Sequence, residues 1–230
     1  MENGKQQYYH QLLGSAALHP DEAIVFSIAC EAIVQQGGCE KNDCEQSAAK
    51  RLIPKARALL LEEKLIGVFD ALYDTGPHIK CLQDANMSYI IVCKGQNFVQ
   101  LQVAKLRQKE EFQSLTWQKN GKTCTAYFTS DLILNGSHTD IKTNYFEYEQ
   151  VDNKTNEIVF RGSWITDLPI DKKNLAELVA VARARWKIEN EVFNTLKNQG
   201  YHLEHNYGHG HKYLATNFAL LTFLAFLSTK

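Results

Sequence analysis

The sequence predicts an α/β protein in which a mixed sheet is flanked by helices and carries an inserted antiparallel β module. Three observations predict this class. Two short apolar runs at 65–69 and 88–94 enclose a helical segment, a strand-like pattern fills residues 112–164, and helical spacing returns after residue 174. The length of 230 residues and the hydrophobic content of 44% suit a globular core that needs no staples.

The charges are almost balanced, with 25 Lys and Arg against 26 Asp and Glu and a formal net charge of −1. This balance excludes a disordered charged tail and a strongly basic nucleic-acid coat protein. It does not exclude an enzyme that acts on DNA, because a local basic strip is compatible with a neutral total.

The N-terminal part predicts an antiparallel hairpin. Segments 8–17 and 23–30 are apolar, and the turn residues 19–22 join them.

A helix is predicted next. Asn42 suits its N-cap, because Glu45 follows three residues later in a capping-box arrangement, and helical spacing continues to about residue 61. Pro54 lies inside this run and predicts a kink or a break.

A β-α-β unit follows. Residues 65–69 and 88–94 have the continuous apolar character of buried strands, and Gly76-Pro77 opens a helix that extends to about residue 86. The two strands are therefore expected to be parallel, with a right-handed crossover. A more polar helix is expected at 99–111.

The inserted module is predicted from strand-like runs at 123–129, 141–151 and 157–165. Phe146 and Tyr148 alternate with acidic residues, which is the period of a sheet with one buried face. Residues 152–156 form a polar turn.

Helical spacing covers about 174–199 and ends at Gly200. A connector rich in Gly, His and Asn at 202–211 leads to an apolar run at 213–227. This run contains polar residues and is shorter than the ~20 residues of a membrane span, so a core helix is expected.

Six cysteines occur, and none forms a C-x-x-C pair. The first residues are polar and lack the apolar region of a signal peptide. We therefore expect reduced, mostly buried thiols in a cytoplasmic protein. The cysteines are Cys30, Cys39, Cys44, Cys81, Cys93 and Cys124.

Asp70 is the first candidate site residue. It directly follows a buried strand, and ligands of open α/β sheets collect at the carboxyl ends of strands. The alternative is an ordinary Asx turn or helix cap without a chemical role.

The charged helix segment 183–191 is the second candidate. Arg185 and Glu189 are four residues apart and share a helix face, as do Arg183 and Lys187. A solvated charged face is the alternative, but interspersed apolar residues predict that part of the helix is buried.

Four histidines gather in the connector. No cysteine lies nearby and the spacing matches no familiar zinc finger, so a polar loop near nucleic acid is favoured over a zinc site. They are His202, His205, His209 and His211. The sequence contains no phosphate-binding loop, dinucleotide fingerprint, G-x-S-x-G or H-E-x-x-H motif.

Taken together, several motifs resemble bacterial insertion-sequence transposases of the DDE class, and they follow the family's order along nearly the whole chain. The motifs are Tyr8-Tyr-His-Gln-Leu-Leu-Gly14, Glu40-Lys-Asn-Asp-Cys-Glu45, Asp70-Ala-Leu-Tyr73, Pro77-His-Ile79, Trp164-Ile-Thr-Asp-Leu168, Arg185-Trp-Lys-Ile-Glu-Asn-Glu191 and the stretch 194–210.

The resemblance implies an RNase H-like fold with the β insertion before the last catalytic helix. It divides the chain into an N-terminal part of the core at 1–111, the insertion at 112–168 and C-terminal helices at 169–230. It also implies three carboxylates that bind two Mg²⁺ ions, which hold the attacking and leaving oxygens during DNA strand cleavage and transfer.

By this resemblance Asp70 is the second carboxylate and Glu189 the third, with Glu191 as the alternative. The family signature Tyr-x2-Arg-x3-Glu-x6-Lys is matched at Arg185 and Glu189. Residue 182 is Ala where Tyr is expected. Leu196 occupies the Lys position, and Lys197 comes one residue later.

In an α-helix one residue turns the side chain by about 100°, so Lys197 is not expected on the same line as the family's lysine. Arg185, Lys197 and Arg183 are the basic residues expected to contact DNA or support the glutamate, since a guanidinium suits both phosphate and carboxylate.

The family's first Asp and its central strand would precede the segment that resembles 8–14, and neither is present. We therefore expect an N-terminally truncated domain with a gap in the sheet and with little or no catalysis. The alternatives are a catalytically inactive DNA-binding or regulatory remnant of a transposase and a zinc-stabilised interaction module. The partners expected are transposon ends and target DNA, with self-association in an active complex, no membrane and a bacterial cytoplasmic location.

Overall fold

The computed structural model describes residues 10–34, 43–61, 63–95, 97–109, 111–205, 208 and 213–229. The chain folds as two compact units, and each is described by itself. The first unit comprises residues 1–61 and 186–230, and the second comprises residues 62–185.

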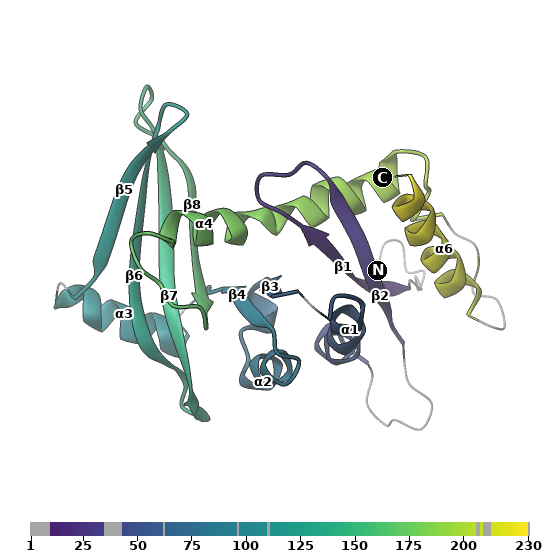
Figure 1. The fold of residues 1–230 in the computed structure, drawn as a ribbon, viewed down its shortest axis with the longest axis horizontal. Coiled ribbons are helices and arrows are strands. Elements are labelled where there is room, and N and C mark those ends of the chain that lie inside the picture. Colours follow the sequence, from purple (N-terminus) through teal and green to yellow (C-terminus); the bar gives the residue numbers. More distant parts are fainter. Residues whose placement is uncertain are drawn as a thin grey trace, which may run out of the picture. The chain divides into compact units, whose positions relative to one another are not determined.

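In the described part of the chain, the first unit contains a two-stranded antiparallel sheet and four helical segments. Figure 1 labels β1, β2, α1 and α6 among them. Its core is formed by side chains from strand β2 and the C-terminal helices. The elements are β1 (Gln11–Leu18), β2 (Val25–Ile33), α1 (Glu45–Leu59), the π-helical segment η2 (Ile188–Phe193), α5 (Asn194–Asn198) and α6 (Leu214–Ser228). The core residues are Val25, Val192, Leu196, Phe223 and Phe226.

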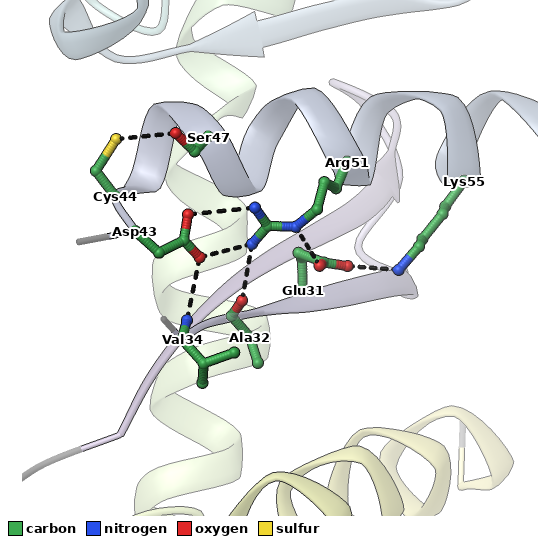
Figure 2. Close-up of polar contacts among 8 residues, drawn as sticks. All are labelled: Glu31, Ala32, Val34, Asp43, Cys44, Ser47, Arg51 and Lys55. Atoms are coloured by element: carbon green, nitrogen blue, oxygen red, sulfur yellow. Dashed lines mark hydrogen bonds and ion pairs between the residues drawn. The ribbon is translucent and has the colours of Figure 1, made fainter. Parts of the chain in front are cut away.

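An ion-pair network joins α1 to β2 (Figure 2). Arg51 donates hydrogen bonds to Asp43 (Nη2 to Oδ2, 2.7 Å) and to Glu31 (Nε to Oε1, 2.6 Å), and Lys55 pairs with Glu31 at 2.5 Å. Asp43 also accepts the backbone N–H of Val34. The side chain of Asp43 is only 5% exposed, so these partners are needed to offset its desolvation.

The second unit is a mixed six-stranded sheet in the order β3-β4-β8-β7-β6-β5. Only β3 and β4 are parallel, and every other neighbouring pair is antiparallel. The strands are β3 (Ile66–Phe69), β4 (Ser88–Val92), β5 (Gln113–Lys119), β6 (Lys122–Asn135), β7 (His138–Asp152) and β8 (Ile158–Thr166). The helices are the 3-10 turn η1 (Ala71–Tyr73), α2 (Gly76–Asp84), α3 (Phe98–Gln108) and α4 (Leu175–Ala184).

Helices cover both faces of this sheet. Alternation along β7 sends Phe146 and Tyr148 toward the apolar face of α4, where Phe146 stacks on Trp164 with ring centroids 5.3 Å apart. Tyr145 and Glu147 point to the other face, where residues of α3 contact them. This mixed α/β arrangement agrees with the predicted class and is consistent with an RNase H-like fold.

Most of the predicted elements are confirmed, including the hairpin, the parallel β-α-β unit and the three long strands of the insertion. Strand β5 was not predicted, although Leu115 and Trp117 alternate with polar residues. Asn120 and Gly121, both with positive φ, form the tight turn that joins it to β6.

Two helices differ from the sequence-based predictions. Helix α1 begins at Glu45 with Cys44 at its N-cap, and the predicted N-cap residue, Asn42, lies outside the described residues. The helix continues through Pro54 without the predicted break, since the neighbouring Leu52 and Ile53 are buried and hold it in place, while a kink at this residue stays a prediction. Helix α6 is not a buried core helix throughout.

The exposure of α6 follows from its composition. It is apolar on all sides, and among the described residues only part of its surface packs against protein. Phe223 and Phe226 are buried, whereas several leucines are exposed. The exposed leucines are Leu214, Leu220, Leu221, Leu224 and Leu227.

Candidate active site

Asp70 lies at the carboxyl end of β3, on the three-residue turn η1. Its backbone is extended and its side chain is exposed, with Oδ1 accepting the N–H of Leu72 at 2.9 Å. Asp70 therefore does form the local helix cap that the sequence left open as the alternative to a chemical role. The cap occupies one carboxylate oxygen and fixes the direction in which the exposed carboxylate points.

The turn that carries Asp70 is held by packing beneath it. The ring of Phe69 contacts the rings of Tyr73 and His78, with centroids 5.3 and 4.6 Å apart. Beyond the turn, Asp74 accepts a hydrogen bond from Asn97 (Nδ2 to Oδ2, 2.7 Å). Burial raises the pKa of the Asp74 carboxyl, and the bond from Asn97 partly offsets this rise.

Glu189 lies in the first unit, on the π-helical segment η2. It is exposed and lines a cavity of about 940 Å³ together with Lys197, Asn190 and Asn194. Glu191 is also exposed on η2, but it is not among the residues that line this cavity. The apolar part of the cavity wall comes mainly from β1, η2 and α6: Leu12, Phe193, Ala215, Ala219 and Phe223.

The π segment explains how Lys197 shares a cavity with Glu189. Regular α-helical spacing predicts that the one extra residue before Lys197 rotates it off the line of the glutamate. A π turn closes i→i+5 hydrogen bonds and takes up one additional residue, so it compensates for that shift. The regular spacing on which the expectation for Lys197 rested therefore does not hold here, because the helix is not regular at this point.

The connector also contributes to the cavity. Glu204 pairs with Lys197 (Oε1 to Nζ, 2.7 Å), and His205 lines the same wall. His202 is exposed and has positive φ. His209 and His211 lie outside the described residues.

Arg183 and Arg185 belong to the second unit. The guanidinium of Arg183 lies over the ring of Phe160, 4.4 Å from its centroid, and over that of Tyr148 at 5.5 Å. Arg183 is thus a packing residue of the α4 face of the sheet. Arg185 is half-buried at the end of α4.

The predicted site residues are therefore divided between the two units. Glu189 and Lys197 come together in the first unit, while Asp70, Arg183 and Arg185 lie in the second. Within the described parts of the chain, no group of three His, Cys, Asp or Glu side chains converges as a metal site. Asp70 and Glu189 each offer an exposed carboxylate, and such hard oxygen donors fit Mg²⁺.

Sequence reasoning missed two supporting contacts, which involve three residues. Asp74 and Asn97 form a contact between two loops that no sequence pattern connects. Lys187 was grouped with a charged face, but its ammonium donates to the carbonyl oxygens of His19, Pro20 and Glu22. Backbone acceptors carry no residue-type signal, so the sequence gives no indication of this contact.

The five described cysteines, Cys30, Cys44, Cys81, Cys93 and Cys124, are free thiols. Among the described residues, no helix has the length and apolar character required to cross a membrane.

Comparison with known proteins gives one family. Residues 38–227 match the model of the transposase DDE domain, which spans both units and includes Asp70, Glu189 and Lys197. No curated protein matches the chain in sequence. Since the match extends over most of the 230 residues, the chain belongs to the transposase DDE domain family.

Proposed function

We propose that this chain is a transposase catalytic domain that binds DNA and cleaves and transfers its strands in a Mg²⁺-dependent reaction. The observation that carries the proposal is the exposed carboxylate of Asp70 at the end of β3, within a chain of the DDE family. A carboxylate at the end of a strand in the sheet stands where α/β proteins collect their ligands.

Asp70 and Glu189 would hold the metal. Bound Mg²⁺ would supply Lewis-acid stabilisation of the phosphate oxygens at which the strand is cut. Glu189 is preferred over Glu191 because it faces the cavity that Lys197 also lines.

Lys197 is proposed to contact a DNA phosphate. Its present partner is Glu204, whose side chain is 68% exposed, so a phosphate group can replace this pair at small cost. Arg185 is proposed to contact phosphate or to steady the glutamate. Arg183, packed on two aromatic rings, is proposed to act by supporting α4.

DNA is the partner that the family implies. We propose that the bound sequences are transposon ends and target DNA, and that copies of the chain associate when they act.

The proposal is tested with a fluorescent duplex that carries the terminal sequence flanking the coding region, and with a scrambled duplex of equal length. Binding is measured in EDTA, and strand cleavage is then followed after addition of Mg²⁺. We expect preferential binding of the terminal duplex and, in line with the low activity expected from the sequence, weak Mg²⁺-dependent cleavage that disappears in Asp70→Asn and Glu189→Gln. Glu191→Gln, on the same segment, is the matched control and should cleave normally.

Binding without cleavage would overturn the catalytic part of the proposal and favour the inactive DNA-binding remnant. Failure to bind either duplex would overturn the proposal as a whole. Zinc detected by elemental analysis in the purified chain, with loss of folding in a chelator, would favour the zinc-stabilised module instead.

A further inference from the structure

Asp74 and Asn97 connect the turn after β3 to the start of helix α3. Asn97 is the N-cap of α3, where its Oδ1 accepts the N–H of Gln100 at 2.9 Å. Its Nδ2 donates to Asp74 Oδ2 at 2.7 Å. Because both ends of the Asn97 amide are engaged, the position of Asp74 is fixed relative to α3.

Asp74 is at one end of η1, and Asp70 is at the other. The turn between them has only three residues, and the N–H of Tyr73 donates to the carbonyl oxygen of Asp70, while that of Asp74 donates to Ala71, both at 3.3 Å. These bonds are long, so the turn depends on the packing beneath it and on what holds its ends. A shift of Asp74 is therefore transmitted to the backbone that directs the Asp70 carboxylate.

The contact needs the shape of the Asp74 side chain and not its charge. Asn97 donates an amide N–H, and either a carboxylate or an amide oxygen accepts such a bond. The described ion pairs do not include Asp74, and burial of a carboxylate without a cation is unfavourable. Asparagine at this position can thus keep the hydrogen bond at lower desolvation cost.

We propose that Asp74 is a positioning residue for Asp70: its hydrogen bond from Asn97 anchors the turn η1 to α3 and holds the Asp70 carboxylate ready for a divalent cation. This inference rests on the metal-binding role given to Asp70 in the proposed function.

Two readouts on the full chain test it. Mn²⁺ affinity is measured by electron paramagnetic resonance, and amide hydrogen exchange is measured by mass spectrometry on peptides that cover 70–75. Asp74→Ala and Asn97→Ser each remove the contact, and serine at 97 keeps an N-cap for α3. Asp74→Asn is the conservative rescue, and Asp84→Ala changes an exposed acid at the end of α2 as a control.

We expect Asp74→Ala and Asn97→Ser each to weaken Mn²⁺ binding by about tenfold, as is typical when support of a ligand is lost, and to speed exchange of the Leu72 amide. The double variant should be no weaker than either single variant, because the two changes remove one interaction. Asp74→Asn and Asp84→Ala should match the wild type in both readouts.

Wild-type behaviour of Asp74→Ala would overturn the inference, and so would a loss in Asp74→Asn as large as that in Asp74→Ala, since charge would then be the contribution. If Asp70→Asn leaves Mn²⁺ binding unchanged, the proposed role of Asp70 fails. The Leu72 exchange readout still decides whether Asp74 fixes the turn.

Discussion

The ammonium group of Lys187 lies 2.8 Å from the carbonyl oxygen of Pro20. It donates also to His19 and Glu22 in the same loop between β1 and β2, at 2.8 and 2.6 Å. Lys187, which lies two residues before Glu189, thus uses all three of its N–H donors on backbone carbonyl oxygens of this loop. Lys187 therefore ties the start of η2 to the hairpin within the first unit.

Lys187→Met should loosen this attachment, because the three carbonyl groups lose their charged donor. We expect a loss of about 1–2 kcal/mol in the local stability of the hairpin, measured by amide exchange in β2. Lys50→Met, at an exposed position on α1, is the matched control. Equal exchange in both variants would show that the lysine does not fix the loop.

The ion pairs of Arg51 with Asp43 and Glu31, which attach α1 to β2, should make the stability of α1 depend on pH. The hydrogen bonds from Arg51 hold the pKa of the Asp43 carboxyl below the usual value. Because the folded pKa is lowered, the stabilisation is present above the unfolded pKa of about 4 and is lost as the pH falls through the folded value.

Arg51→Met should therefore destabilise α1 by about 2 kcal/mol at neutral pH, and the difference from the wild type should shrink on acidification. Amide exchange of α1 measured at neutral and acidic pH checks this, after correction for the intrinsic pH dependence of exchange. A difference that stays constant with pH would contradict the account.

Gly67 leaves room for the ring that supports Asp70. A Cβ atom at this position would overlap the ring of Phe69, two residues along β3, and that ring is packed on Tyr73 and His78. Gly67→Ala should cost about 1–3 kcal/mol through overpacking and should disturb the η1 turn. The free energy of unfolding, measured by chemical denaturation, and the Mn²⁺ affinity should both decrease. Gly136→Ala, where the added atom meets nothing within 4 Å, is the control.

Arg183 should matter for stability through its aromatic contacts. Arg183→Ala should lower the free energy of unfolding by about 1 kcal/mol, because the cation–π contact with Phe160 is lost. Arg183→Lys should retain part of it. If Arg183→Ala leaves stability intact and abolishes DNA binding, Arg183 contacts DNA directly and the supporting role is wrong.

Sequence reasoning predicted the elements where local signals and tertiary packing agree. The alternation around Phe146 and the apolar runs that flank Gly76-Pro77 are of this kind. The start of α1 was not predicted correctly. Arg51 pairs with Asp43 there, and the helix begins only after Asp43, at Glu45. Sequence reasoning failed again at η2, because a π turn has no residue signature and arises from packing.

The candidate site was predicted only in part for a similar reason. Asp70 was singled out by its place after an apolar run, although that run forms the edge strand β3, whose residues are partly buried or exposed and not fully buried as predicted. Asp74, Asn97 and Lys187 act through contacts distant in sequence, and neither their type nor their spacing indicates those partners. Lys197 was expected to lie off the line of the family's lysine on the basis of regular α-helical spacing, and that spacing does not hold across the π segment.

The proposed function requires that Asp70 and Glu189 act as ligands of a divalent cation. Mn²⁺ titration followed by electron paramagnetic resonance tests it most directly, with wild type, Asp70→Asn, Glu189→Gln and Glu191→Gln compared under one buffer condition. We expect Asp70→Asn and Glu189→Gln each to weaken binding by about tenfold or more, while Glu191→Gln binds as the wild type does. Unchanged affinity in Asp70→Asn, or a loss confined to Glu191→Gln, would contradict it.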